Sequence, residues 1–292
     1  MSIGKAILMG IVQGLTEFLP VSSSGHLAIV KCMFKADTET GILFDVLLHV
    51  ATLVAVCAVY YKDILRLILE FAGMVTDIFE NVLMFFKSKG KAEKKSYRTI
   101  VNSPYRKFVV LLIVTTIPTG IIGVLMSDVV ESASSTIIVP GICLICTAVM
   151  LMISDYLPEG GKKSKTANYG DAFSIGVAQG IATLPGVSRS GTSITACLLC
   201  GFDRKYAVKY SFIMSIPAII GALIMELTKI DGEHITGSDV GCYLVGMIFA
   251  AIVGYIALRV TIKIVSGRFF KWFAYYCAAV GIISIIVYIV TL

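Results

Sequence analysis

Charged residues are scarce in this chain of 292 residues, in which Asp, Glu, Lys and Arg together make up 15% and hydrophobic residues 57%. The mean hydropathy is +0.88, and this composition excludes an ordinary soluble globular protein. We expect an integral membrane protein that crosses the bilayer several times. We attribute the net charge of +6 to basic residues in cytoplasmic loops. The expected partner is therefore the bilayer, and we expect no nucleic acid.

The sequence also lacks a cleavage site and a cysteine metal centre. No Ala-x-Ala site follows the first apolar stretch, so we expect no separate signal peptide. The eight cysteines include Cys143-x-x-Cys146 and Cys197-x-x-Cys200, but neither pair has a histidine or a second cysteine pair at the spacing of metal ligands. We interpret the thiols as small apolar packing residues.

Two similar segments are present, 166 residues apart. The segment from Gly10 to His26 aligns without a gap on the segment from Gly176 to Thr192, and seven of the 17 positions are identical. Each copy contains Gly-x-x-x-Gly, starting at Gly10 and Gly176, which gives its first helix a flat face for close packing. Interrupted apolar segments at matching places in two halves of a membrane protein point to a buried site. We therefore expect the functional site between the two copies.

Each copy is too short and too broken to form a full membrane span. In the first copy a helix from about Ile3 should end at Leu19, because a residue that precedes proline is disfavoured in a helix, and a new helix should start near Ser22. The second copy should break at Pro185 and restart near Ser188. We predict two re-entrant helix-loop-helix units that meet at the membrane midplane, at residues 3–31 and 171–200.

Six apolar runs have the length of a bilayer span. They are residues 42–60, 108–126, 136–156, 206–227, 241–260 and 272–290. The segment 64–86 is also long enough, but it carries Arg66, Glu70, Asp77 and Glu80. Because four ionisable groups in one span would be costly, we predict an amphipathic helix on the cytoplasmic surface.

Without that helix, each half has three spans after its motif, and the halves enter the membrane from opposite sides. The predicted fold is therefore an all-α integral membrane protein with an inverted-topology repeat, six transmembrane helices and two re-entrant units. Its parts are a first repeat region at 1–126 with a cytoplasmic insertion at 64–107, a third span of the first half at 136–156, and a second repeat at 171–292.

Basic residues gather in three loops. The segment 87–107 holds eight Lys and Arg against one acid, and two more basic loops contain Lys162 and Arg268. The loops after Met126 and Leu227 are acidic. The positive-inside rule places the three basic loops in the cytoplasm and leaves residues 31–41 facing outward.

The two broken loops have the chemistry of a phosphate site. Restarting helices present unpaired backbone N–H groups and the positive end of the helix dipole. Hydroxyl groups come from Ser22, Ser23, Ser24, Ser188, Ser190 and Ser193. Arg189 adds a forked cation, and a guanidinium at membrane depth is costly unless it is paired, so we expect an anionic ligand there. The alternative is that the serines only cap helices and Arg189 reaches the cytoplasmic surface.

A carboxylate and an imidazole accompany the serines. Glu17 shares a helix face with Gln13, and His26 follows Ser22 by one turn. A carboxylate, an imidazole and a hydroxyl beside phosphate can supply a metal ligand or base, a proton shuttle and a nucleophile. A packed polar residue is the alternative for His26. We interpret His49, one turn after Asp45, as a supporting or structural residue.

The segments from Glu17 to His26 and from Pro185 to Ser193 resemble the two signature motifs of the undecaprenyl pyrophosphate phosphatase family, the bacitracin-resistance proteins. The likeness extends over essentially the whole chain. It implies hydrolysis of the C55 lipid pyrophosphate to the monophosphate, which recycles the carrier of cell-wall precursors. It also implies a divalent cation, Mg²⁺ or Ca²⁺, and a multi-pass protein of the bacterial plasma membrane whose site is reached from the outer leaflet.

This sequence departs from the family pattern at two positions. The family commonly has Glu where Gln13 stands, which leaves Glu17 as the sole acidic candidate for a metal ligand. The Thr that often ends the second motif is Ser193 in this chain, with Thr192 adjacent. Either residue supplies a hydroxyl, so we expect no effect from the second departure.

The expected mechanism is a phosphoryl transfer through serine. A substrate site is expected from Arg189, Ser188, Ser190, Ser22, Ser24, Thr192, Ser193 and Gln13. The cation near Glu17 neutralises phosphoryl charge, and Ser23 attacks while His26 takes and returns the proton. Direct attack by water, with His26 or Glu17 as base, is the alternative mechanism. The sequence also leaves open whether the protein forms a homodimer.

Two other functions compete with this hypothesis. A lipid flippase or transporter shares the architecture of broken helices and inverted repeats. Lipid transport alone needs no nucleophile beside a proton shuttle. The presence of Glu17, His26 and several serines in one loop therefore favours the enzyme. An acid-phosphatase type of lipid phosphatase is a weak alternative, because we find no matching flanking motifs around the Ser24-Gly-His26 segment.

Overall fold

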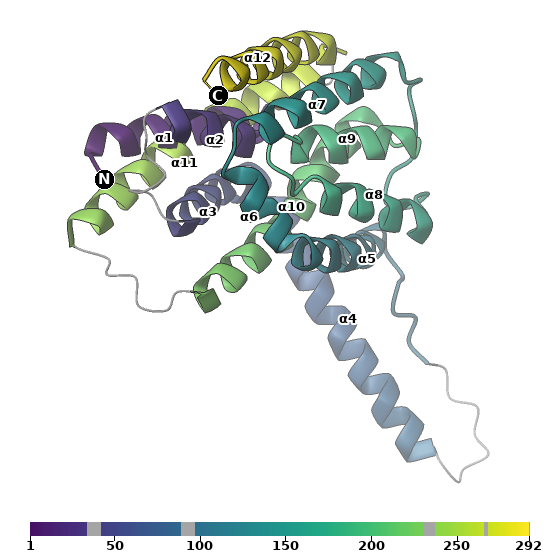
Figure 1. Ribbon diagram of the computed structural model, residues 1–292. Helices are drawn as coiled ribbons and strands as arrows, with labels where there is room; N and C mark the ends of the chain where they lie inside the picture. Colours follow the sequence, from purple (N-terminus) through teal and green to yellow (C-terminus); the bar gives the residue numbers. More distant parts are fainter. Residues whose placement is uncertain (34–41, 89–96, 230–236, 266–267, 292) are drawn as a thin grey trace.

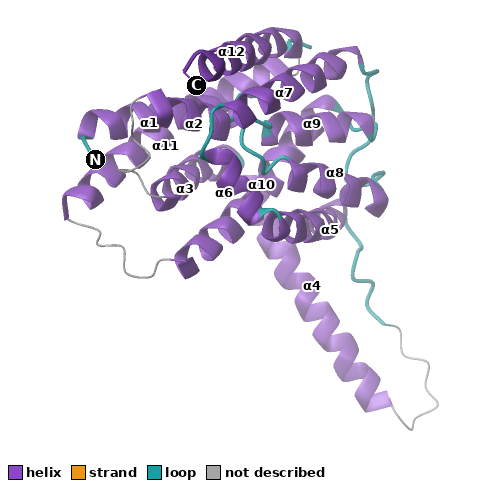
Figure 2. Ribbon diagram, viewed as in Figure 1, coloured by secondary structure: helices purple, strands orange, loops and turns teal. Residues whose placement is uncertain are grey.

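A computed structural model describes residues 1–33, 42–88, 97–229, 237–265 and 268–291 (Figure 1). Parts of the predicted outward loop at 31–41, the basic segment at 87–107 and the acidic loop after Leu227 lie outside these ranges. Within the described ranges the regular elements are helices, and none is a strand (Figure 2). The all-α prediction is thereby confirmed.

The described part of the chain forms twelve helices. They are α1 (Ile3–Phe18), α2 (Ser23–Met33), α3 (Ile42–Val59), α4 (Tyr61–Ser88), α5 (Pro104–Leu125), α6 (Ser127–Ser134), α7 (Ile138–Tyr156), α8 (Tyr169–Ile181), α9 (Arg189–Leu199), α10 (Arg204–Lys229), α11 (Gly237–Val265) and α12 (Phe270–Thr291). The short helix α6 was not predicted from the sequence.

Five described helices are long and apolar enough to cross a membrane: α5, α7, α10, α11 and α12. The helices α3 and α4 pass the same test only together, and they are bent by 90° where they join. The chain is therefore a multi-pass helical membrane protein. Six spans and the membrane depth of the broken units stay predictions.

Both duplicated segments are broken, the first where predicted and the second four residues earlier than predicted. Helix α1 ends at Phe18, and α2 begins at Ser23. Helix α8 ends at Ile181, earlier than the break predicted at Pro185, because the intervening residues form turns. Helix α9 begins at Arg189 with Ser188 as its N-cap.

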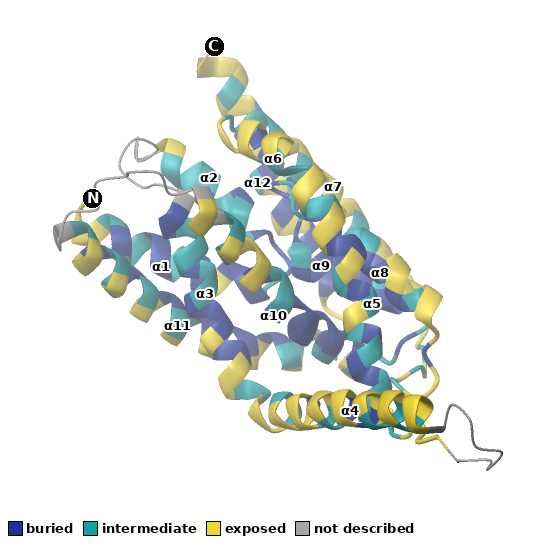
Figure 3. Ribbon diagram, turned by 90° about the horizontal axis from the view of Figure 1, so that it is seen from below, coloured by how far each residue is buried: buried dark blue, intermediate teal, exposed yellow. Residues whose placement is uncertain are grey.

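Helix α4 is amphipathic, and its apolar face is exposed at one edge of the molecule (Figure 3). Its opposite face carries acidic groups that are paired. Arg106 donates to Glu70 over 3.1 Å and to Asp77 over 2.5 Å, and Lys209 of α10 donates to Asp63. This pairing fixes α4 against α5 and α10, and its apolar face is free for lipid. Its position on the cytoplasmic surface stays a prediction.

The glycine faces of the two copies pack in the same way. Helix α1 lies along α11, and α8 lies along α5 (Figure 1). A Cβ atom on Gly10 would lie 2.3 Å from the carbonyl oxygen of Gly246, and one on Gly176 would lie 2.3 Å from that of Thr115. Thr119 adds a hydrogen bond of 2.9 Å from its hydroxyl to the carbonyl oxygen of Gly176. These close approaches bring each broken unit against a long helix and fix the height of the loop that follows.

The packing predicts that Gly176→Ala destabilises the protein although alanine favours helix. The added methyl group would meet the backbone of α5, and overpacking of this kind costs roughly 1–3 kcal/mol. Gly120→Ala is the matched control, because nothing lies within 4 Å of its added Cβ and the helix gains roughly 0.5–1 kcal/mol. Thermal unfolding in detergent should show opposite shifts, and equal shifts would contradict the close approach.

Candidate active site

The loops of the two copies meet beside a cavity of about 300 Å³. A Cβ atom on Gly25 would lie 2.9 Å from Cα of Gly186, so the two loops touch at glycine. The Ser190 hydroxyl donates to the carbonyl oxygen of Leu19 over 3.4 Å. The prediction that the duplicated segments converge is therefore confirmed.

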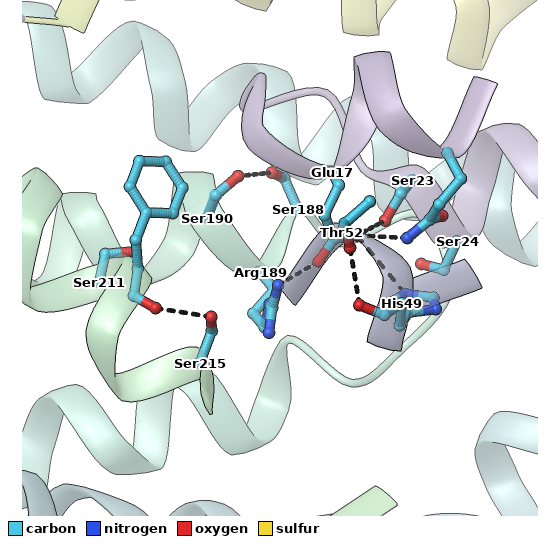
Figure 4. Close-up of polar contacts among 12 residues, drawn as sticks. Glu17, Ser23, Ser24, His49, Thr52, Ser188, Arg189, Ser190, Ser211 and Ser215 are labelled. Atoms are coloured by element: carbon cyan, nitrogen blue, oxygen red, sulfur yellow. Dashed lines mark hydrogen bonds and ion pairs between the residues drawn. The ribbon is translucent and has the colours of Figure 1, made fainter. Parts of the chain in front are cut away.

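Glu17 lines this cavity and lies at the centre of a group of polar contacts (Figure 4). It occupies the last turn of α1 and is 5% exposed. Its Oε2 accepts a hydrogen bond of 2.6 Å from the Ser23 hydroxyl and one of 2.9 Å from the Gln13 amide. The Nε2 atom of His49 lies 3.5 Å from the same oxygen. A serine hydroxyl thus points directly at a buried carboxylate.

Arg189 pairs with Glu17 across the two loops (Figure 4). Its Nη2 atom donates to Oε1 of the carboxylate, and its side chain is 22% exposed. Glu17 therefore supplies a counter-charge within the protein, and the predicted anionic ligand at Arg189 stays a prediction. The guanidinium still lines the cavity, where it can meet an anion.

Serines hold the first turn of α9. The Ser188 hydroxyl accepts from the backbone N–H of Gly191 over 3.1 Å and lies 3.3 Å from the hydroxyl of Ser190. The backbone N–H of Ser188 donates to Thr147 over 3.0 Å. Both serines, like Ser22, Ser23 and Ser24, line the cavity. The N-termini of α2 and α9 therefore reach one space, as a phosphate site requires.

Three predicted ligands do not line the cavity. Gln13 lies behind Glu17 and donates to it. Ser193 bonds the hydroxyl of Ser211 over 2.5 Å, which fastens α9 to α10. Thr192 is buried, and its hydroxyl has no hydrogen-bond partner within the described structure. Their predicted role in direct substrate binding has no support in this arrangement and stays a prediction.

His26 faces away from Ser23. Its Nδ1 lies 2.7 Å from the carbonyl oxygen of Ser22, and its Nε2 lies 2.8 Å from the hydroxyl of Tyr276 on α12. The ring does not line the cavity. Its predicted role as proton shuttle stays a prediction, with no contact to Ser23 to support it.

The structure adds two polar residues from α3 to the site. His49 lines the cavity, with Nδ1 bonded over 2.8 Å to the carbonyl oxygen of Asp45. Asp45 also lines it and accepts from Lys31 over 2.6 Å. The sequence signal was the one-turn spacing of Asp45 and His49 in an apolar run, which predicted a supporting role only.

Apolar side chains also line the cavity. They are Val187, Ala218, Ile219, Ala222 and Val130, the last of these from the unpredicted helix α6. A sequence in which apolar residues are this abundant gives no signal for them. A lining of both charged and apolar side chains fits a ligand with a charged head and a hydrocarbon tail.

The described residues do not build a complete divalent-cation site. No three His, Cys, Asp or Glu side chains in the described ranges converge as metal ligands would. Glu17 is the nearest carboxylate to Ser23, and both of its oxygens are engaged by protein donors. A cation here would need its shell completed by oxygens of an anionic ligand and by water.

A helical membrane protein that places a serine, a carboxylate and a guanidinium in one buried cavity has the features of a membrane-embedded enzyme for an anionic substrate. Residues 6–283 match the family described as bacitracin resistance protein BacA. The chain belongs to this family.

Relatives support the assignment along the whole length. A protein of Methanosphaera stadtmanae named undecaprenyl-diphosphatase is 39% identical over 286 residues, which cover 98% of each chain. One of Treponema denticola with the same name is 40% identical over 282 residues, which cover 97% of this chain and 96% of the relative. The sequence resemblance to this family is thereby confirmed.

The ion pair predicts that Arg189 contributes both to activity and to stability. Arg189→Ala should lower turnover of an anionic substrate by about 100-fold or more, and Arg189→Lys should restore little, because lysine lacks the fork. The alanine variant should also lose up to about 3 kcal/mol of stability, since Glu17 stays buried without its counter-charge.

The matched control combines Arg189→Met with Glu17→Gln, which removes both charges at similar volume. Thermal unfolding should return towards the wild-type value while activity stays lost. Near-normal turnover of Arg189→Ala, or a double variant no more stable than the single, would contradict the pairing.

Proposed function

We propose that this protein hydrolyses undecaprenyl pyrophosphate to undecaprenyl phosphate and phosphate, and so recycles the lipid carrier of cell-wall precursors. The observation that carries the proposal is the Ser23 hydroxyl bonded to Glu17 over 2.6 Å, with Arg189 on the other carboxylate oxygen. Membership of the family and the names of the relatives support the same substrate.

Substrate binding uses both loops. The terminal phosphate contacts the Arg189 guanidinium and the hydroxyls of Ser188, Ser190 and Ser24, which face the same cavity. First-turn N–H groups of α2 and α9 add to this anion site. When a phosphate oxygen takes the guanidinium, Oε1 of Glu17 is released. The first isoprene units lie against the apolar side chains that α6 and α10 contribute to the lining.

The chemical step proceeds through serine. The Ser23 oxygen attacks the terminal phosphorus, its proton passes to Glu17, and the bond to the bridging oxygen breaks. Undecaprenyl phosphate leaves, and phosphoserine remains. Water then attacks the phosphoserine and breaks its bond from phosphorus to the serine oxygen. Glu17 returns its proton to that oxygen, and phosphate leaves with the two protons of the water. Glu17 replaces His26 as the proposed base, because Glu17 holds the serine proton in a direct hydrogen bond.

A divalent cation, Mg²⁺ or Ca²⁺, stays part of the proposal. Glu17 is the residue that would hold it, together with pyrophosphate oxygens, and the ion would offset charge on the transferring phosphoryl group.

Lipid transport is the less favoured function. Transporters also have broken helices and paired repeats, as this fold does. A carrier, however, needs no serine bonded to a carboxylate beside an anion site, and the named relatives are phosphatases.

The proposal also gives the protein an orientation in the cell membrane. The two halves form an inverted repeat whose broken units meet at midplane, and the cavity opens to the outer face. Reciprocal packing of α1 on α11 and of α8 on α5 supports the two-fold relation of the halves, because an inverted repeat relates these pairs by its axis.

Single cysteines test this topology. The native Cys32 at the end of α2, which is exposed, should react with an impermeant thiol reagent from outside in a background without the other cysteines. Tyr97→Cys, at a position that is 52% exposed, should react only after permeabilisation. Reaction of both cysteines from the same side of the membrane would contradict the inverted repeat.

Purified protein tests the function directly. It should release phosphate from a polyprenyl pyrophosphate, and EDTA should suppress the release if a cation takes part. Ser23→Ala should lose at least about a thousandfold in turnover while substrate still binds. Adding Glu17→Gln to Ser23→Ala should cost little more, because residues that act as a unit are not additive.

Ser23→Thr is the informative control, since it keeps a hydroxyl with a stiffer rotamer and should keep part of the activity. If Ser23→Ala keeps more than about a tenth of wild-type turnover, water attacks directly and the serine is only a ligand. Absence of phosphate release by the wild-type protein would contradict the function itself.

A further inference from the structure

The residue before the proposed nucleophile has an unusual backbone conformation. Ser22 has φ of +69°, and among described non-glycine residues only Arg268 shares a positive φ. A side chain in this left-handed region is disfavoured and persists when its surroundings hold it. Because Ser22 directly precedes Ser23, its conformation sets the direction in which the Ser23 hydroxyl leaves the chain.

The carbonyl group of Ser22 is held from two sides by His26. It accepts from the backbone N–H of His26 over 3.2 Å and from Nδ1 of the ring over 2.7 Å. A carbonyl oxygen can only accept, so Nδ1 carries the hydrogen in the neutral ring and Nε2 is the acceptor. The tautomer of His26 is therefore fixed by the backbone of Ser22.

Tyr276 on α12 completes the contact. Its hydroxyl lies 2.8 Å from Nε2 of His26 and donates to it, and the two rings stack with centroids 5.5 Å apart and planes inclined by 6°. The next residue, Cys277, has its sulfur 3.8 Å from the carbonyl oxygen of Pro20 in the same loop. Helix α12 packs along α7, so it offers a rigid support for this loop.

We propose that Tyr276 and His26 form a clamp that holds Ser22 in its left-handed conformation and thereby aims the Ser23 hydroxyl at Glu17. This inference rests on the proposed role of Ser23. His26 and Tyr276 are positioning residues: neither lines the cavity, and both ring nitrogens of His26 have partners other than Ser23. The clamp and a proton shuttle at His26 make opposite predictions.

Replacements at His26 separate the two roles. Asparagine places an N–H near the position of Nδ1 and can still donate to the carbonyl oxygen of Ser22, but it cannot shuttle a proton. His26→Asn should therefore keep much of the wild-type kcat, whereas His26→Ala should lose about 100-fold through misplacement of Ser23. KM should change little in either variant, because the anion-binding groups are intact.

Tyr276→Phe tests the second half of the clamp. It keeps the stacked ring, removes the hydroxyl and should lower kcat severalfold in the wild-type background but hardly at all with His26→Ala, because both act on one contact. Tyr275→Phe is the matched control, since that ring is 57% exposed and stacks edge-on against Trp272. Thermal unfolding of every variant shows whether the fold is retained.

A spectroscopic readout is independent of turnover. With ¹⁵N-labelled histidine, of which the chain has three, the Nε2 resonance of His26 should move in Tyr276→Phe and stay in Tyr275→Phe. His26→Asn as inactive as His26→Ala, additive losses in the double variant, or an unmoved resonance would overturn the clamp. A wild-type protein that releases no phosphate would instead refute the proposed function. The Nε2 resonance of His26 would in that case still test the contact with Tyr276.

Discussion

The ion pair between Glu17 and Arg189 is the interaction on which the rest of the site depends. It joins two loops separated by 172 residues, and the carboxylate is almost fully buried. Neither charge would be tolerated alone in an apolar protein interior. Because the pair sits where the loops touch, it fixes the distance between the nucleophile on one loop and the cation on the other. The serine hydroxyl then takes the remaining face of the carboxylate.

Packing of the long helices makes that pair geometrically possible. Gly10 and Gly176 let α1 and α8 approach the backbones of α11 and α5 more closely than any residue with a Cβ would allow. Each broken unit is thereby held by a helix of the other half of the chain. A side chain at either glycine would shift a loop, and a shift of one ångström at a reacting group can cost about 100-fold in rate. The glycine faces and the chemistry are therefore linked through backbone position.

The sequence predicted the parts of the site that depend on local rules. Proline and glycine marked both helix breaks, and serines beside them marked the caps of α2 and α9. It could not predict contacts between elements distant in the chain. His26 and His49 look alike in sequence, because each follows a polar residue by one turn. They also share a local contact, since each bonds its Nδ1 to the carbonyl group four residues earlier. Which of them meets Glu17 depends on how α2 and α3 are rotated towards α12 and α1, and tertiary packing alone decides this.

The same limit explains why the sequence did not predict the partner of Arg189. Local sequence gives Arg189 no partner, since the nearest acids along the chain are Asp171 and Asp203. Its partner comes from the other copy of the duplicated segment.

The two copies have diverged so that together they make one site rather than two. With the offset of 166 residues, Ser23 matches Arg189, and Glu17 matches Thr183, which also lines the cavity. At each matched pair one copy supplies the reacting group and the other supplies the counter-charge or a neutral hydroxyl. Neither copy carries both charges: two copies like the first would place carboxylates and no guanidinium beside the cavity, and two copies like the second would place a guanidinium and no carboxylate at each loop. The buried ion pair between Glu17 and Arg189 therefore requires one copy of each kind.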